Sequence, residues 1–197
     1  VTYAYSSGRV SSITSAAGTV NYSSSDATGE RTVTVTDALS HSTVYKFDIA
    51  SERMTSVTNA VGKTTSWQYD GDGRTTRITQ DEGNYTAFTY DSRGNVTETR
   101  QVAKSGPGPG DIVTSASYPS TCTDPETCNS PTTTTDALGN VTDYAYDSTT
   151  GLVTSITLPA ASTGAVRPQT RFGYTALQAY YDKGSGIVAS GAPVTRL

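Results

Sequence analysis

Residues 88–96 read Phe-Thr-Tyr-Asp-Ser-Arg-Gly-Asn-Val, and this stretch decides the fold. Alternate aromatic residues lie on the same face of a β-strand, because successive side chains point to opposite faces. The aspartate accepts backbone N–H groups at the start of a turn, and the glycine supplies the positive φ that a type I turn with a bulge requires. The stretch therefore predicts an antiparallel β-hairpin.

The same pattern recurs along the chain at a regular interval. Phe47 and Tyr69 are 22 residues apart, and Tyr69 and Tyr90 are 21 residues apart, which suits one hairpin and its connection. A shorter pattern with Gly-Asn or Gly-Lys turns the chain into the next unit, as in residues 135–140. The residues that we predict to build the repeats are Tyr3, Tyr5, Gly8, Tyr45, Phe47, Asp48, Trp67, Tyr69, Asp70, Gly73, Phe88, Tyr90, Asp91, Gly94, Tyr144, Tyr146, Asp147 and Gly151.

The composition agrees with an all-β fold. The 197 residues include 13 tyrosines, threonine is the most abundant residue, and valine far exceeds leucine. Branched and aromatic side chains suit a pleated surface, and 18 glycines suit frequent tight turns. One such unit buries too little to fold alone, so we expect tandem antiparallel hairpins that stack as a solenoid.

Apolar residues on the returning strands are spaced by three, as in Val10 and Ile13, Met54 and Val57, or Val153 and Ile156. A regular strand would place the two members of each pair on opposite faces. Either a β-bulge separates them or the sheet is covered on both sides. The sequence leaves both alternatives open.

The period divides the chain into three parts. Residues 1–100 hold about five repeats, and residues 101–131 break the period with the run Ser-Gly-Pro-Gly-Pro-Gly at 105–110. We expect residues 101–131 to be one inserted surface loop that contains both cysteines. Residues 132–197 hold two further repeats and an irregular tail with strand-like stretches at 186–189 and 192–195.

Charge and hydropathy argue against two classes of partner. The formal net charge is −4, and the basic residues are scattered rather than gathered in the stripe that binds phosphates, so we expect no nucleic acid. No apolar run approaches the roughly 20 residues of a membrane span.

No constellation for catalysis, a cofactor or a metal stands out. His41 is the only histidine, and we interpret it as an ordinary turn residue. The run Asp70–Gly73 resembles a calcium loop, but Arg74 stands where a further oxygen ligand is needed. We therefore expect turn chemistry there, no catalytic or metal-ligating residue, and no enzyme.

Cys122 and Cys128 are the only cysteines. Their spacing is not one that binds zinc. A disulfide that closes a small loop in an exported protein is the favoured interpretation, and two free thiols in a cytosolic protein remain the alternative.

The repeat resembles the tyrosine–aspartate (YD, or RHS) repeat family. The resemblance rests on Phe88–Val96, on Tyr144–Asp147 with Gly151–Val153, and on further copies at one period. It implies a spiralling sheet of hairpins that can close into a hollow shell, of which this chain would be a solenoid-like fragment. It also implies a secreted or bacterial cell-surface setting, and in toxins of the family the shell holds an effector.

Two functions follow as hypotheses. The first is a structural array whose partners are the neighbouring repeats of a longer parent chain, with an encapsulated effector in that parent. The second is an adhesive module whose aromatic residues, such as Trp67, stack on the sugar rings of a surface glycan. We favour the first, because the aromatic residues recur at strand positions expected to form the core.

The two ends of the sequence have strand character without protective residues. Val1 to Tyr5 starts within a repeat, and residues 194–197 end on a bare strand. Unpaired strand edges pair readily with other chains. We therefore expect a fragment of a longer protein that self-associates when isolated.

Overall fold

The computed structural model of the chain describes residues 1–104, 110–189, 191 and 193–196. The predicted all-β class is confirmed, since none of these residues lies in a helix. The chain divides into two compact units, Val1–Val113 and Thr114–Leu197. Each is described by itself.

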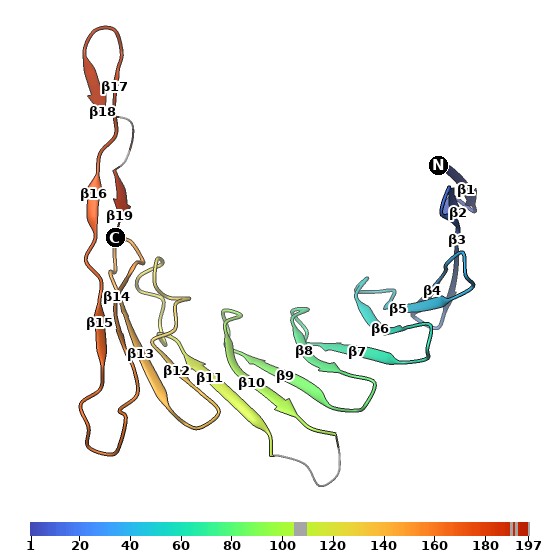
Figure 1. Ribbon diagram of the computed structural model, residues 1–197, viewed down its shortest axis with the longest axis horizontal. Coiled ribbons are helices and arrows are strands. Elements are labelled where there is room, and N and C mark those ends of the chain that lie inside the picture. The colour runs from blue at the N-terminus through green and yellow to red at the C-terminus, as the bar shows by residue number, and fades with distance from the viewer. Residues whose placement is uncertain (105–109, 190, 192, 197) are drawn as a thin grey trace. The chain divides into compact units, whose positions relative to one another are not determined.

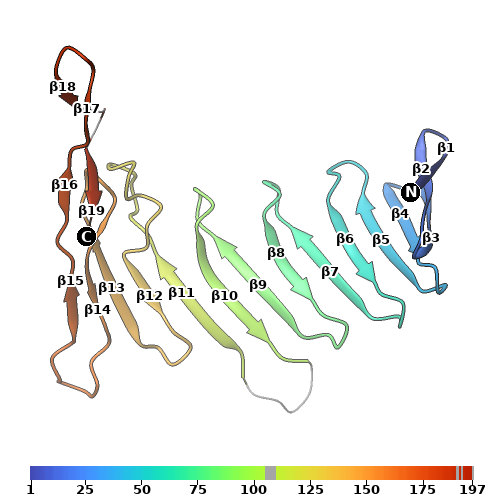
Figure 2. The same cartoon turned by 45° about the horizontal axis from the view of Figure 1, so that its top comes forward.

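The strands of the first unit are β1 (Thr2–Ser6), β2 (Arg9–Ser15), β3 (Gly18–Ala27), β4 (Glu30–Thr36), β5 (Ser42–Asp48), β6 (Met54–Thr58), β7 (Thr64–Tyr69), β8 (Thr75–Thr79), β9 (Tyr85–Tyr90) and β10 (Val96–Val102). Each strand pairs antiparallel with the next strand of the chain (Figures 1 and 2). The unit is therefore a row of hairpins, as the tandem repeat predicts.

The second unit begins within β11 (Ile112–Ser117), at Thr114. In this unit β11, β12 (Thr133–Thr135), β13 (Val141–Tyr146), β14 (Val153–Thr157) and β15 (Gln169–Arg171) also pair in chain order. After them, β16 (Thr175–Leu177) pairs with β19 (Val194–Arg196), and β17 (Tyr180–Asp182) pairs with β18 (Ile187–Ala189). The strands β18 and β19 correspond to the strand-like tail, of which residue 192 lies outside the described residues.

The returning strands contain a β-bulge, which decides between the two alternatives that the sequence left open. Phe47 pairs with Met54, but Lys46 pairs with Ser56, so Thr55 is an extra residue. Met54 and Val57 therefore share a face although they are three residues apart. The extra residue is a serine or threonine in each bulged hairpin, namely Ser11, Thr55, Thr76, Thr97 and Thr154.

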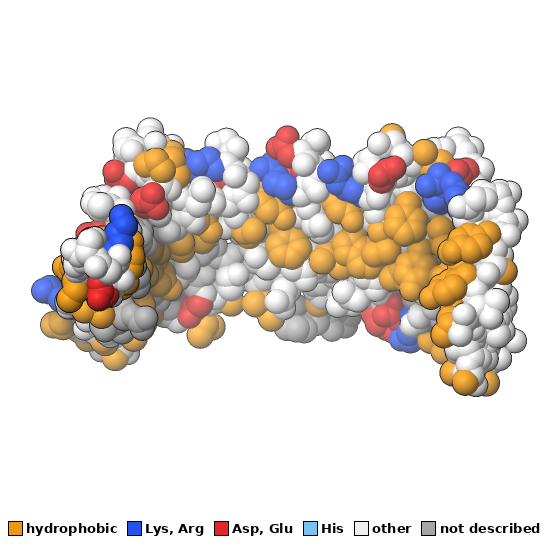
Figure 3. All heavy atoms as spheres, turned by 90° about the horizontal axis from the view of Figure 1, so that it is seen from above, with side chains coloured by type: hydrophobic (Ala, Val, Ile, Leu, Met, Phe, Trp, Pro, Cys, Tyr) orange, Lys and Arg blue, Asp and Glu red, His pale blue; other side chains and the backbone are white. Residues whose placement is uncertain are grey.

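The bulge and the strand alternation produce a sheet with two different faces. On one face the aromatic residues lie opposite the apolar residues of the returning strand, as in the pairs Tyr45–Val57 and Trp67–Ile78. The residues between them, such as Lys46 and Gln68, lie on the other face. Figure 3 shows hydrophobic side chains gathered along the first of these faces, which we call the aromatic face.

The expectation that the aromatic residues form the core is wrong. Trp67, Tyr69, Tyr90 and Tyr146 are only half-buried. Among the residues that the structure describes, only Cys128 is buried, with 5% of its surface exposed. The physical reason is that each unit has a single layer of sheet, so a ring packs against neighbouring strands but has no second layer above it.

The inserted segment also differs from the prediction. Residues 101–131 are not one loop, because β10 extends to Val102 and β11 lies within the segment. The strand β11 pairs with β12, so this hairpin continues the repeat. Most of the proline–glycine run, at residues 105–109, lies outside the described residues.

Candidate functional site

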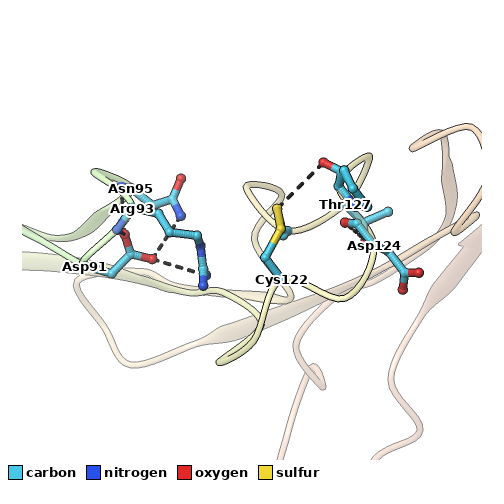
Figure 4. Close-up of a disulfide and its surroundings, with 8 residues drawn as sticks. Asp91, Arg93, Asn95, Cys122, Asp124 and Thr127 are labelled. Atoms are coloured by element: carbon cyan, nitrogen blue, oxygen red, sulfur yellow. Dashed lines mark hydrogen bonds and ion pairs between the residues drawn. A yellow bond between two sulfur atoms is a disulfide. The ribbon is translucent and has the colours of Figure 1, made fainter.

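The hairpin turns form the first part of the candidate site. In the turn of β9–β10, Asp91 Oδ1 accepts the N–H groups of Arg93 and Asn95, both at 2.9 Å (Figure 4). Gly94 has a φ of 88° and donates its N–H to the Asp91 carbonyl at 3.1 Å. The side-chain hydrogen bond from Asn95 is the main cause that holds the pKa of Asp91 below its usual value.

The connections between hairpins use the same chemistry. Asp136 Oδ1 accepts the N–H groups of Leu138 and Asn140, both at 2.9 Å, and Gly139 has a φ of 81°. Asn59 makes the equivalent pair of bonds to Val61 and Lys63 with its amide oxygen. A charged carboxylate is therefore not required by the turn, because a neutral side-chain oxygen in the same place also accepts both N–H groups.

His41 lies in one of these connections. Its Nδ1 lies 3.1 Å from Asp37 Oδ2, and its side chain is 62% exposed. Asp37 in turn accepts the backbone N–H groups of Leu39 and His41. This geometry agrees with the interpretation of His41 as a turn residue.

The second part of the site joins successive hairpins through the tyrosine of the repeat. The ladder between β6 and β7 runs from Thr58–Thr64 only as far as Ser56–Ser66, so the carbonyl of Met54 lies beyond it. The hydroxyl of Tyr69 donates a hydrogen bond to that carbonyl at 2.8 Å. Buried or half-buried carbonyls need a donor, and here the tyrosine supplies it where the bulge has ended the ladder.

We call this hydrogen bond, from a tyrosine hydroxyl to a backbone carbonyl of the preceding hairpin, the tyrosine joint, and it recurs in both units. The hydroxyl of Tyr90 donates to the Thr75 carbonyl at 2.6 Å. In the second unit, Tyr146 donates to Pro131 at 2.9 Å, and Tyr174 donates to Val153 at 2.8 Å. The recurrence explains why tyrosine rather than phenylalanine stands at the second aromatic position of most repeats.

An arginine adds a further contact to the joint. The guanidinium carbon of Arg74 lies 5.0 Å from the centre of the Tyr90 ring, and Arg74 Nη1 donates to the Asp91 carbonyl at 3.3 Å. Arg53 lies over Tyr69 in the same way, at 5.8 Å. A cation over an aromatic face is attracted to it, so each arginine attaches its own turn to the ring of the next hairpin.

The glycine of the repeat leaves room for this arginine. A Cβ atom added to Gly73 would lie 1.7 Å from Arg53 Nη2. In the second unit a Cβ atom added to Gly151 would lie 2.7 Å from the backbone carbonyl of Glu126. The loop of residues 118–131 thus takes the place over Gly151 that Arg53 takes over Gly73.

That loop contains the two cysteines. Cys122 and Cys128 are joined by a disulfide (Figure 4), and Cys128 is the buried residue noted above. Cys128 Sγ lies 3.7 Å from the carbonyl of Pro125, and the N–H groups of Thr127 and Cys128 both donate to the Asp124 carbonyl at 3.0 Å. The loop connects β11 to β12 in place of the short turn with aspartate and glycine.

Sequence reasoning missed the hairpin to which this loop belongs. Tyr118 directly follows β11, 28 residues after Tyr90 and 28 before Tyr146. Burial is the first cause that raises the pKa of Tyr146, and the neighbouring hydroxyls of Tyr144 and Tyr118 add to it. The pattern was hidden because proline follows Tyr118 where other repeats have aspartate; the equal spacing was the available signal.

The first two hairpins depart from the repeat. Tyr3 and Tyr5 pair with Ile13 and Val10, but 55% and 66% of their surfaces are exposed. Gly8 belongs to a two-residue turn in which Ser7 also has a positive φ, of 50°, and this differs from the turn with aspartate. Hairpin β3–β4 has no bulge along its paired residues.

The other predicted repeat residues take up the same arrangement as those described. Tyr45 and Phe47 lie opposite Val57 and Met54, Phe88 lies opposite Thr99, and Tyr144 lies opposite Ile156. The carboxylates of Asp48, Asp70 and Asp147 accept backbone N–H groups of their own turns. Asp70 and Asp72 both contact Arg74, at 2.7 and 2.9 Å, so these two carboxylates are neutralised by a side chain of the same turn.

The described part of the chain contains no group of three or more histidine, cysteine, aspartate or glutamate residues that could hold a metal ion. It also contains no helix long and apolar enough to cross a membrane. The contacts described above cap the aspartate turns and attach several of them to the next hairpin.

Comparison with known proteins identifies the repeat. The profile described as RHS Repeat matches residues 50–84 and 69–105. No curated protein matches the sequence. The solved structure titled "Crystal Structure of TcdB2-TccC3-Cdc42" is similar with a TM-score of 0.40 at 14% identity, over 87% of this chain and 12% of that chain. The matched residues, 50–105, contain the joints made by Tyr69 and Tyr90, and over this part the chain is similar to the RHS (YD) repeat.

Proposed function

We propose that the chain is a segment of a repeat wall in a longer, exported parent protein, and that its aromatic face lines the side on which cargo lies. The role of a structural repeat array follows from the family and the fold. The observation that supports the wall is the sorting of side chains in the first unit, where the rings share one face and residues such as Lys46 and Gln68 share the other. Catalysis is not part of this proposal.

The cargo in this proposal is an effector segment of the same parent chain. A half-buried aromatic face retains apolar surface that another polypeptide can cover, and covering it is favourable by about 25 cal/mol per Å² of apolar area. The disulfide between Cys122 and Cys128 supports an exported parent, because disulfides persist in oxidising compartments.

Footprinting tests the wall. Hydroxyl radicals oxidise exposed aromatic side chains, so Trp67 and Phe88 should be modified in the isolated chain and protected in the parent protein with its effector. Tyr3 and Tyr5, which are already exposed, serve as internal references for radical dose within the isolated chain. Equal modification of Trp67 in a parent with the effector and in a parent lacking it would contradict the cargo role.

A second candidate function is adhesion to a surface glycan through the aromatic face. The specific observation in its favour is that Trp67 and Tyr90 keep part of their surface exposed instead of being covered by a second layer. The fluorescence of Trp67, the only tryptophan, should then change when neutral oligosaccharides are added. No change in the fluorescence of the wild type at millimolar sugar would count against adhesion by this face, and Trp67→Phe, which removes the only tryptophan, gives the background signal.

A further inference from the structure

The disulfide loop of residues 118–131 covers part of hairpin β13–β14 in the second unit. The hydroxyl of Tyr146 donates a hydrogen bond to the Pro131 carbonyl at 2.9 Å. The carbonyl of Glu126 lies beside Gly151, in the turn that joins β13 to β14. The loop is therefore held against this hairpin at two separate places.

The loop and the hairpin together line a small pocket. Its volume is about 170 Å³, below the roughly 300–1,000 Å³ of clefts that hold whole small molecules, so it suits the end of a single side chain. Both elements belong to the second unit. The lining includes Asp124, Thr127 and Ser130 of the loop and Tyr144, Tyr146 and Ser148 of the hairpin.

The pocket is acidic and offers hydrogen-bond acceptors. Asp124 is the only charged residue among the described residues that line it, and residues 118–131 contain two acidic residues but no lysine or arginine. Figure 4 shows the Asp124 carboxylate directed away from the disulfide, and this carboxylate forms no ion pair with another described residue. Within the described ranges the hydroxyls of Ser130 and Ser148 also make no hydrogen bond. One negative charge and two hydroxyl oxygens are thus available to a cationic donor.

We propose that this pocket binds the alkylammonium group of a lysine side chain from a polypeptide partner, and that Asp124 recognises its charge. An ammonium group has three N–H donors, which match the carboxylate and the two serine hydroxyls. The hydroxyls of Tyr144 and Tyr146 are engaged with Thr134 and Pro131, so these tyrosines offer their rings. A lysine stem packs against apolar surface while its charged end stays near water, and an aromatic ring also attracts the cation.

The size and charge of the pocket select among cations. A lysine ammonium is a compact point charge, whereas a guanidinium is a larger planar fork that needs a flat site. A calcium ion takes six or more oxygen ligands, and the described residues contain no cluster of acidic groups that could supply them. The site does not depend on the cargo role, because it needs only the loop and one hairpin of this chain.

Titration of the full chain with a short peptide that has one lysine and blocked ends, followed by amide NMR spectra, tests the proposal. We expect shifts confined to residues 124–132 and 144–148. Asp124→Asn should weaken binding about fivefold, which is the upper end of what an exposed ion pair contributes. The melting temperature of this variant should stay near that of the wild type, because the Asp124 carboxylate makes no hydrogen bond to another described residue. Glu126→Gln is the matched control, since it removes a carboxylate of the same loop that does not line the pocket, and it should change the affinity far less.

Ligand controls decide the chemistry. The same peptide with an acetylated lysine should cause no shifts at these residues, because acetylation removes the charge. Added salt should weaken the binding of the unmodified peptide, since the pocket is open to solvent. Putrescine that binds more tightly than the lysine peptide would overturn the polypeptide source, and an arginine peptide of equal affinity would overturn selection for an ammonium group. Shifts elsewhere on the chain, or an Asp124→Asn variant with full affinity, would overturn the site.

Discussion

At the scale of single residues, the repeat depends on side-chain oxygens and glycines that satisfy the turn. Asp91 and Gly94 have different roles in the turn: the carboxylate accepts two backbone N–H groups, and the glycine adopts a φ of 88°. Ser40 and Glu52 have φ values of 68° and 56°, so the chain also forces side-chain-bearing residues into this region. An L-residue in this region costs about 1–2 kcal/mol.

Two glycine substitutions separate conformational strain from steric clash. Gly94→Ala and Gly151→Ala should both destabilise, by about 1–2 kcal/mol, because L-residues resist positive φ. Gly151→Ala should cost more, since its Cβ would meet the Glu126 carbonyl at 2.7 Å, whereas the Cβ at Gly94 would lie 3.7 Å from Arg74. Hydrogen exchange of β9 and β13 in the two variants measures the local losses; equal losses would refute the clash.

The turn aspartates should make stability depend on pH. The pKa of Asp91 is lowered in the folded chain, first by the hydrogen bond from Asn95. The contribution of the Asp91 carboxylate to stability is therefore fully present above its pKa in the unfolded chain, about 4. It is lost as the pH falls through the lower pKa of the folded chain. Asp91→Asn should be less stable than the wild type at pH 7, and the difference should shrink towards pH 3.

The connection at Asn59 allows the opposite substitution, from a neutral amide to a carboxylate. Asn59 already makes the same pair of backbone contacts as a neutral residue. Asn59→Asp should therefore add acid sensitivity where Asp91→Asn removes it. Urea unfolding at several pH values measures both changes, and parallel pH profiles for the wild type and the two variants would rule out a titrating turn.

At the scale of hairpins, the bulge explains the tyrosine. It ends the ladder between neighbouring hairpins early, and the tyrosine hydroxyl then reaches the carbonyl beyond the end of the ladder. Phe47 has no hydroxyl, so hairpin β5–β6 lacks this bond to the hairpin before it. The joints of one array are thus unequal, although the strand pattern is the same.

Removal of one hydroxyl measures the strength of a joint. Tyr90→Phe should lower the free energy of unfolding by about 0.5–1.5 kcal/mol, because the Thr75 carbonyl loses its donor at 2.6 Å. Tyr5→Phe is the matched control, since Tyr5 is exposed and makes no such bond in the part of the chain that the structure describes. An identical loss in both variants would show that the hydroxyl acts through solvation rather than through the joint.

The disulfide loop substitutes for a turn, so its closure should matter for the hairpins beside it. Air-equilibrated protein should show no free thiol, and two thiols should appear after reduction. Reduction should also increase hydrogen exchange in β13 more than in β7, because Glu126 contacts the turn that follows β13. Two free thiols before reduction would contradict both the bridge and the exported setting.

At the scale of the molecule, the single layer of sheet sets the behaviour in solution. Half-buried rings on one face mean that the units retain apolar surface after folding, and such surfaces mark interaction sites. Neighbouring repeats extend the sheet sideways but do not cover this face. A partner that covers it must come from outside the layer.

The isolated chain should therefore self-associate with rising concentration. Sedimentation velocity over a concentration series should show a shift to larger species, and the double substitution Trp67→Thr with Phe88→Thr should reduce it, because apolar area is lost from the aromatic face. Lys46→Gln on the other face should change association little. A strictly monomeric wild type at high concentration would show that the face remains hydrated.

The sequence alone determined the all-β class, the hairpin as the repeated unit and the turn chemistry. These are local properties, since alternation along a strand and an aspartate–glycine turn involve residues only a few positions apart. Prediction from these local patterns failed at Tyr118, where proline and a disulfide loop replace the turn. It also failed for the segment 101–131, which was expected to be one loop but contains β11.

Only the tertiary structure decided how the hairpins meet. The bond from Tyr69 to Met54 and the placement of Arg53 over Gly73 join residues from different strands, and no spacing in the sequence reports them. The spacing by three gave the bulge as one of two alternatives, and the strand pairing decided between them. Burial was also decided at this level. An aromatic residue in a strand gives the same alternating sequence pattern whether or not a second layer covers it. The pattern depends only on the face of the strand that the residue occupies, whereas its burial depends on what packs over that face.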